Sequence, residues 1–311
     1  MNPTGLGWWS LASKPEVIPS DALATATLRL ASLSMRFLPE FFVRILAVTF
    51  GAFWFNLVRY RRGVILSNLA QAFPAKTHKE RCRLGQAACV HLIRTVFEFH
   101  RIPRNIRSCF ERVVRIEGIE HYEAAKNRGK GIFVVSGHLG SFELGIAAAA
   151  CRLSSFSVIV KRFPDTIDRH IAGIRSSSGL EIIPAHGAIK AVLEALKYNR
   201  TVVVVLDQNS TARKGVFVDF FGRPACTMAG LAILALRTGA PVIGASVWRE
   251  HNGVHVVRFH PEFPRERKAS RDETVQHLTQ LYTSFIERAI RLHPEQWFWP
   301  HKRFKTRPPG E

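Results

Sequence analysis

One stretch decides the fold: Gly131-Ile132-Phe133-Val134-Val135-Ser136-Gly137-His138-Leu139-Gly140-Ser141-Phe142-Glu143. Its apolar run ends at a Gly-His pair, and a small-residue helical pattern follows over residues 144–153. A short apolar run of this kind is typical of a strand that is buried on both faces of a sheet. We therefore expect a strand that delivers His138 to the edge of a sheet, with Glu143 on the opening turns of the next helix.

The spacing between His138 and Glu143 determines what the two side chains can do together. Within a single helix, four intervening residues would turn them away from each other. If His138 instead lies in the turn between strand and helix, Glu143 can reach back to it. A carboxylate that accepts a hydrogen bond from one imidazole nitrogen fixes the tautomer and leaves the other nitrogen as a base. The pattern therefore predicts a base with its orienting carboxylate, and the helix N-terminus adds donors that could hold an oxyanion.

Strands and helices alternate on both sides of this stretch. Further strands are expected at 113–116, 157–160, 180–183, 201–206, 215–221, 242–249 and 254–260, and further helices at 121–127, 166–177, 188–198, 228–238 and 273–292. The last two strands flank Asn252-Gly253, which is a hairpin signal. This alternation predicts an α/β fold with a mostly parallel central sheet flanked by helices, over residues 111–311.

The chain before this α/β region is expected to be helical and to associate with a membrane. Residues 1–25 read as a loose lead-in without the features of a cleaved signal peptide, in which Trp8 and Trp9 could touch a membrane interface. Residues 26–110 read as helices, broken at Phe73-Pro74. The uncharged piece at 45–58 is shorter than the ~20 residues that a spanning helix needs.

The aromatic residues of this apolar piece and the cations after it favour a helix that lies in the membrane interface or forms a short anchor. Basic residues beside an apolar helix suit an anionic leaflet, at ~1 kcal/mol each. The alternative is a buried core helix capped by exposed arginines. The residues concerned are the aromatic Phe41, Phe42, Phe50, Phe53, Trp54 and Phe55 and the basic Arg59, Arg61 and Arg62.

The net charge of +20 favours an anionic partner, such as nucleic acid, an anionic membrane surface or an acidic ligand. The alternative is a basic surface that serves solubility alone. The chain has no zinc-finger spacing, RNA-binding aromatic motif or zipper, so nucleic acid is not expected as a partner. It has five cysteines without C-x-x-C spacing, which argues against a disulfide framework or a zinc site and for a reducing compartment.

Several other catalytic motifs are absent. Ser136 and Ser141 do not lie in a G-x-S-x-G context, so neither is expected to be a hydrolase nucleophile. There is no dinucleotide-binding or P-loop glycine pattern and no H-E-x-x-H pair. His251 and His255 flank the hairpin turn and are expected on the surface rather than as metal ligands.

Residues 137–143 resemble the catalytic block of the bacterial lipid A biosynthesis lauroyl/myristoyl acyltransferase family, a branch of the lysophospholipid acyltransferases. Further blocks resemble this family, in family order. They are 59–74, 175–179, 207–209, 220–227 with Gly230 and 238–241, and 294–299 with His301, Arg303 and 305–308. The resemblance identifies 111–311 as an acyltransferase catalytic domain.

The resemblance implies an O-acyltransferase of the late lipid A type, on the cytoplasmic face of the bacterial inner membrane. It would move an acyl chain from an acyl-carrier-protein thioester, or acyl-CoA, to a hydroxyl of a lipid A precursor. His138 would take the hydroxyl proton, Glu143 would orient His138, and Arg175 would stabilise the oxyanion or contact phosphate. No metal or bound cofactor is implied, and the partners would be acyl-carrier protein, anionic membrane lipids and the lipid acceptor. The residues assigned to substrate binding are Arg223, Thr227, Asp207 and Gln208.

Each secondary assignment has a structural alternative. Arg175 could form an ion pair on a helix surface, and Asp207 could cap a turn or hold Arg223. The C-terminal block is expected to give core or interface anchors and membrane-surface charges, namely Trp297, Trp299, Arg303 and Lys305. For the whole chain, the alternatives are an acyltransferase with another phospholipid or glycolipid acceptor and a basic lipid-binding protein without catalysis.

Overall fold

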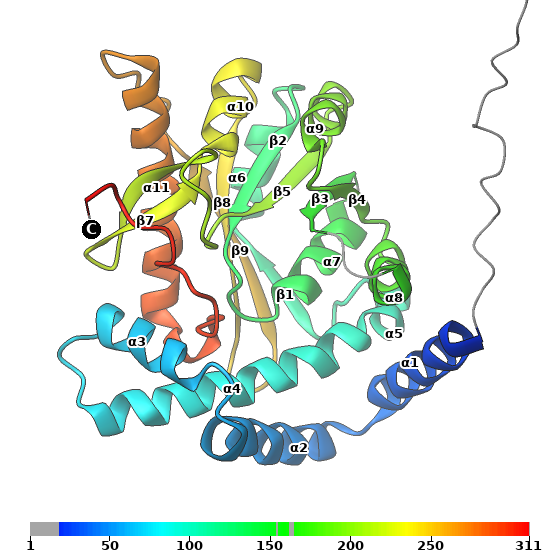
Figure 1. The fold of residues 1–311 in the computed structure, drawn as a ribbon. Coiled ribbons are helices and arrows are strands. Elements are labelled where there is room, and N and C mark those ends of the chain that lie inside the picture. The colour runs from blue at the N-terminus through cyan, green and yellow to red at the C-terminus, as the bar shows by residue number, and fades with distance from the viewer. Residues whose placement is uncertain (1–18, 154, 162–164, 311) are drawn as a thin grey trace, which may run out of the picture.

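Seven strands form a central sheet in the computed structural model, which describes residues 19–153, 155–161 and 165–310 (Figure 1). They are β1 (Val114–Glu117), β2 (Ile132–Ser136), β3 (Phe156–Val160), β4 (Glu181–Pro184), β5 (Thr201–Val205), β8 (Val242–Arg249) and β9 (His255–Glu262). The strand order is β1-β9-β8-β2-β5-β3-β4. All pairs are parallel except β8 with β9. The predicted α/β fold with a mostly parallel sheet is confirmed.

Strand β2 lies at the centre of the sheet, between β8 and β5. All five of its residues are buried, as expected for a strand covered on both faces. Its register places Ser136 opposite Val205, so β2 and β5 end at the same edge of the sheet. The residues that follow these two strands, His138 and Asp207, are therefore brought together there.

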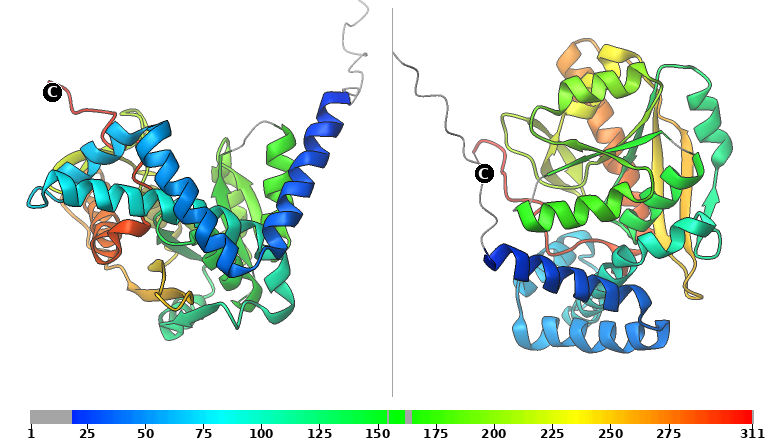
Figure 2. Two further views of the ribbon diagram at one scale, coloured as in Figure 1. Left: turned by 90° about the horizontal axis from the view of Figure 1, so that it is seen from below. Right: turned by 90° about the vertical axis from the view of Figure 1, so that its right-hand side faces the viewer.

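Helices cover both faces of the sheet (Figures 1 and 2). They are α6 (Ile119–Lys126), α7 (Phe142–Leu153), α8 (Asp165–Ser176), α9 (Ala188–Lys197), α10 (Gly230–Thr238) and α11 (Arg271–Leu292). Phe133 and Val135 of β2 pack into the core with α9, α10 and α11. Ile132 and Val134 belong to a second core with α6 and α7. The alternation of β2 side chains thus joins two hydrophobic cores.

A two-stranded antiparallel ribbon, β6 (Gly215–Phe220) and β7 (Arg223–Met228), stands apart from the main sheet. The sequence predicted the first of these strands but not the second. Pro224 within β7 weakens the strand signal, because proline cannot donate to a ladder. A two-stranded ribbon consists of edge strands, and such strands tolerate a proline.

The N-terminal region forms a layer of helices beyond the edge where β2 and β5 end (Figure 1). They are α1 (Pro19–Phe37), α2 (Glu40–Phe53), a π-helical turn (Trp54–Val58), α3 (Arg62–Ala72), α4 (His78–His100) and the one-turn helix α5 (Ile102–Asn105), followed by a 3-10 turn (Ile106–Ser108). The break predicted at Phe73-Pro74 is confirmed. Residues 19–25, which were expected to be loose, belong to α1, and Trp8 and Trp9 lie outside the described residues.

Helix α2 and its π-helical turn form one apolar helix from Glu40 to Val58, long and apolar enough to cross a membrane. One narrow face packs on α4, where a Cβ at Gly51 would lie only 2.5 Å from the Cα of Val90. Only 22% of the helix is buried, so it is not the core helix of the alternative interpretation. Its large exposed side chains, with those of α1, are Leu30, Leu33, Phe37, Phe41, Phe42, Ile45, Val48, Phe50, Phe53, Leu57 and Val58.

Candidate active site

His138 lies in a tight turn between β2 and α7. A Cβ at Gly137 would come within 2.9 Å of Ile286, and a Cβ at Gly140 within 2.5 Å of the Val247 carbonyl oxygen. Gly140 also has a φ of +61°, which favours glycine. The two glycines therefore let the turn lie against the rest of the protein, with His138 held between them.

The carboxylate of Asp207 holds His138 from two directions. The distance from His138 Nδ1 to Asp207 Oδ1 is 2.6 Å, and the backbone N–H of His138 donates to Oδ2 at 2.7 Å. The indole N–H of Trp297 also donates to Oδ2, at 2.7 Å. A carboxylate on Nδ1 places the proton there and leaves Nε2 as the base.

The charges of this pair are coupled. Burial alone would raise the pKa of Asp207, but the charge and hydrogen bonds of His138, with the bond from Trp297, lower that pKa to about 2. Burial alone would lower the pKa of His138, but the charge and hydrogen bond of Asp207 outweigh it and raise that pKa. An ionised, buried Asp207 thus makes His138 a stronger base.

The structure corrects the predicted partnership of His138 with Glu143. Asp207 occupies the orienting position, because the register of β2 and β5 brings the ends of both strands together. Glu143, on the first turn of α7, instead accepts two hydrogen bonds from Arg175 of α8, at 3.0 and 2.5 Å. Both members of this pair are mostly buried, so Arg175 is not the surface ion pair of the alternative interpretation.

The Glu143–Arg175 pair lies close enough to His138 to act on it. Glu143 helps to raise the pKa of His138 and Arg175 opposes it, although both effects are smaller than that of Asp207. The hydrogen bonds to Glu143 use Nε and Nη2 of Arg175. Its Nη1 atom makes no hydrogen bond to the part of the chain that the structure describes.

The four predicted substrate-binding residues fall in different places. Gln208 lies at the site, with its Nε2 atom 3.3 Å from Nε2 of His138. Asp207 is a partner of His138, and does not hold Arg223 as the alternative interpretation expected. Arg223 instead lies over the ring of Phe304, at 5.6 Å. Thr227 is fully buried, so the structure contradicts its predicted contact with an acceptor.

The C-terminal block packs beneath the site. Arg303 is fully buried and was wrongly interpreted as a membrane-surface charge. It donates to the carbonyl oxygens of Cys226, at 2.8 Å, and Gln208, at 3.3 Å, and to the hydroxyl of Thr227. Burial lowers its pKa to about 10, within the range where it stays charged at neutral pH. Arg303 therefore ties the ribbon β6–β7 to the loop after β5.

Aromatic residues of this block complete the wall around His138. Trp297 and Trp299 are buried, as predicted, and Trp297 also orients Asp207. The backbone N–H of Phe298 donates to the carbonyl oxygen of His138, at 3.2 Å, and Phe142 places its ring 4.8 Å from the imidazole. The roles of Trp297 and Phe298 were missed, because nothing in the sequence indicates how a C-terminal segment returns to β2.

His255 was also wrongly expected on the surface. Its side chain is buried, and Nε2 lies 3.5 Å from Oε1 of Glu98. His251 is exposed at the hairpin turn, as predicted, but the second strand of the hairpin begins at His255, in contact with Glu98 of α4. Among the described residues, no group of three or more His, Cys, Asp or Glu side chains could hold a metal ion.

Comparison with known proteins finds several that are similar to this chain at low sequence identity. A phosphatidylinositol mannoside acyltransferase of Mycobacterium tuberculosis (strain CDC 1551 / Oshkosh) is 29% identical over 209 residues, which cover 64% of this chain and 63% of that protein. The lipid A biosynthesis lauroyltransferase of Escherichia coli (strain K12) is 24% identical over 267 residues, 84% of each chain. A crystal structure of the 1-acyl-sn-glycerophosphate (LPA) acyltransferase PlsC from Thermotoga maritima aligns with a TM-score of 0.39 and 14% identity, covering 80% of this chain and 96% of that one.

A family model extends over nearly the whole described chain. The model described as bacterial lipid A biosynthesis acyltransferase matches residues 19–306. This range includes the N-terminal helices, the residues around His138 and the C-terminal block with Trp297. The chain belongs to the bacterial lipid A biosynthesis acyltransferase family.

Proposed function

We propose that this protein is an O-acyltransferase that moves a fatty acyl chain from a thioester to a hydroxyl group of a membrane lipid. The observation that carries the proposal is the pair formed by His138 and the buried carboxylate of Asp207, at the sheet edge next to Arg175. This arrangement supplies a base, its orienting anion and a cation within one site. A basic lipid-binding protein without catalysis would not need it.

The first step uses His138 as a general base. The acceptor hydroxyl donates to Nε2, which takes the proton while the hydroxyl oxygen attacks the thioester carbonyl carbon. Asp207 stabilises the imidazolium that forms. The attack gives a tetrahedral intermediate with a negative oxygen, without an acyl-enzyme.

The second step expels the thiolate. The C–S bond breaks as the carbonyl re-forms, and the imidazolium of His138 gives its proton to the leaving sulfur. Arg175, held by Glu143, is the cation we assign to the oxyanion through its Nη1 atom. The products are an ester and a thiol, and the mechanism requires no metal and no bound cofactor.

The surface of the protein supports our proposals for the donor and the location. An exposed apolar face on α1 and α2 suits a membrane interface, where it would bring the site to a lipid acceptor. The net charge of +20 suits both an anionic leaflet and an acidic carrier of the acyl chain. We propose acyl-carrier-protein thioester as donor, with acyl-CoA as the alternative, at the cytoplasmic face of the bacterial inner membrane.

For the acceptor, we propose a lipid A precursor. The family model and the Escherichia coli relative carry names of lipid A biosynthesis. The mycobacterial relatives are named phosphatidylinositol mannoside acyltransferases, which makes a glycosylated phospholipid the second candidate.

Mass spectrometry of the lipid products tests these assignments. The full-length protein is incubated with acyl-carrier-protein thioester or acyl-CoA, and with one acceptor at a time: a lipid A precursor, a phosphatidylinositol mannoside or a lysophospholipid. We expect the lipid A precursor to gain the mass of one acyl chain. Acylation of another acceptor only would reject the lipid A assignment, and acylation of none would reject acyl transfer.

A further inference from the structure

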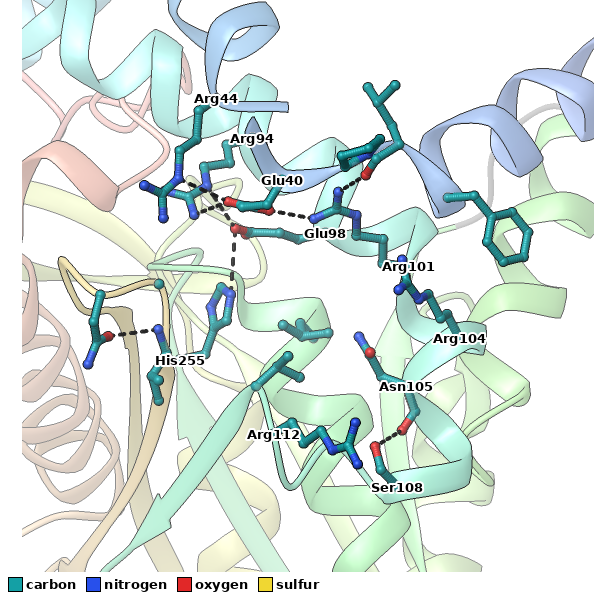
Figure 3. Close-up of a pocket in the computed structure, with 18 residues that line it drawn as sticks. Glu40, Arg44, Arg94, Glu98, Arg101, Arg104, Asn105, Ser108, Arg112 and His255 are labelled. Carbon is teal, nitrogen blue, oxygen red and sulfur yellow. Dashed lines mark hydrogen bonds and ion pairs between the residues drawn. The ribbon is translucent and has the colours of Figure 1, made fainter. Parts of the chain in front are cut away.

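A pocket lies between the N-terminal helices and the sheet (Figure 3). Its volume is about 720 Å³. It is lined by the α1–α2 junction, by α4 and the turns that follow it, and by Leu144 of α7. His138, Asp207, Glu143 and Arg175 do not line it, so this pocket is separate from the catalytic residues although Leu144 directly follows Glu143.

Positive charge is in excess in this pocket. Five arginines and two glutamates line it: Arg44, Arg94, Arg101, Arg104, Arg112, Glu40 and Glu98. Glu40 accepts from Arg94 at 2.5 Å and from Arg101 at 2.6 Å. Glu98 accepts a hydrogen bond from Arg249, a residue that does not line the pocket, at 2.5 Å. The two carboxylates are thus already paired.

Arg104 and Arg112 remain without an acidic partner among the described residues. Arg104 makes only a long contact, 3.4 Å, with the carbonyl oxygen of Arg36, and Arg112 has no hydrogen bond to the described chain. Figure 3 shows Arg112 near Ser108, and Arg104 between Asn105 and Arg101. Two guanidinium groups without an acidic partner among the described residues therefore line the same pocket.

Several buried polar atoms on the lining have no hydrogen-bond partner among the described residues, namely Nε of Arg94 and Arg101, Oε2 of Glu98 and Nδ1 of His255. His255 is 4% exposed, and its Nδ1 atom is buried without a hydrogen bond among the described residues. Buried polar atoms without partners cost free energy, and the Nε–H groups of the two arginines among them are donors that an anionic ligand could satisfy. Arg104 and Arg112 are exposed, so a ligand can reach their guanidinium groups.

The junction between the apolar helices α1 and α2 also lines the pocket. It contributes Phe37, Leu38 and Pro39, and Phe37 is 63% exposed. Phe41, on the next turn, is 67% exposed. A lipid with its acyl chains along this apolar face would place its head group at the arginines.

We propose that this pocket binds the phosphomonoester head group of a membrane lipid, with Arg104 and Arg112 as the phosphate ligands. A phosphomonoester carries a charge of about −1.5 to −2 at neutral pH, which two guanidinium groups neutralise. Arginine forks bind phosphate oxygens in pairs and hold them more firmly than a diffuse surface charge does. The proposal does not depend on acyl transfer, because no catalytic residue takes part.

Vesicle binding tests the site. The full-length protein is sedimented with phosphatidylcholine vesicles that contain phosphatidic acid or phosphatidylglycerol, adjusted to equal surface charge. We expect the wild type to prefer phosphatidic acid, and the double variant Arg104→Gln/Arg112→Gln to bind those vesicles roughly tenfold more weakly and to lose the preference. A control with the same net charge, Arg83→Gln/Arg107→Gln, changes two exposed arginines that do not line the pocket and should keep the preference.

Equal losses in the two double variants would assign the binding to general surface charge and overturn the proposal, as would the absence of a preference in the wild type. Calorimetry with inorganic phosphate alone separates the two sources of the ligand. If inorganic phosphate binds the wild type more tightly than the vesicles do, and the pocket variant loses it, the site takes a soluble phosphate and the lipid assignment is rejected. Unchanged melting temperatures show that each variant is folded.

Discussion

Two carboxylates lie near His138, and their surroundings give them different roles. Asp207 is buried and touches the imidazole directly, while Glu143 is engaged by Arg175. A buried anion that accepts three hydrogen bonds is held rigidly, which suits a group that must orient a base. The side chain of Glu143 instead fixes the cation that faces the reacting carbonyl in our proposal.

Replacing Asp207 by Asn should lower turnover by roughly a thousandfold, because the imidazole loses its tautomer control and the stabilisation of its imidazolium form. Steady-state acyl transfer measures the effect. Asp272→Asn, at the exposed start of α11, is the matched control and should keep wild-type turnover. Wild-type turnover in Asp207→Asn would contradict the role of Asp207.

The pH dependence of kcat/KM should show an acidic limb set by His138. The base must be neutral, so activity is lost as pH falls through the pKa of His138, which Asp207 raises above its ordinary 6.5. Without the charge of Asp207, burial lowers that pKa. In the pH profile of the residual activity of Asp207→Asn, the acidic limb should therefore move to lower pH. An acidic limb at the wild-type pH would exclude the effect of Asp207 on the pKa of His138.

At the scale of single elements, we propose that the exposed face of α2 contacts a lipid surface. Phe41 and Phe53 are 67% and 50% exposed, whereas Phe55, close by, is 1% exposed. We expect Phe41→Ser/Phe53→Ser to weaken binding to vesicles roughly tenfold or more without lowering the melting temperature, since little folded-state packing is lost. Tyr198→Ser, which removes an aromatic side chain that is 70% exposed on the far side of the sheet, is the control and should bind normally.

The ribbon β6–β7 depends on Arg303. Its removal leaves the carbonyl oxygen of Cys226 and the hydroxyl of Thr227 without this donor, in a place that water does not reach. Arg303→Ala should lower the free energy of unfolding by about 3 kcal/mol in urea denaturation. The neighbouring Lys302 is exposed, and Lys302→Ala should change stability little. Equal stability of the two variants would show that Arg303 is dispensable to the fold.

For the whole molecule, the sequence predicted the strands of the sheet well, since each buried strand is a short apolar run that can be recognised from its own residues. The sequence did not predict the strand order or the partner of His138. Asp207 is 69 residues from His138 in the chain, and only the pairing of β2 with β5 brings them together. A usable signal was present: both residues directly follow apolar runs, and the carboxyl ends of neighbouring parallel strands meet at one edge.

The polar residues with wrong assignments share one cause. Arg303, Thr227 and His255 were interpreted by residue type, as surface or ligand-binding groups. Each is buried because a distant segment covers it, and sequence patterns carry little information about such coverage. By contrast, the roles of Trp297 and Trp299 as core anchors were predicted, because large aromatic side chains are buried in most contexts.

In our proposal, His138 is the general base for transfer of an acyl chain from a thioester to a lipid hydroxyl. A single-turnover assay with labelled acyl-carrier-protein thioester and lipid A precursor tests it most directly, in wild type, His138→Ala and the exposed-histidine control His186→Ala. We expect labelled lipid from the wild type and the control, and none above background from His138→Ala at unchanged melting temperature. Labelled lipid formed by His138→Ala at the wild-type rate would contradict the account.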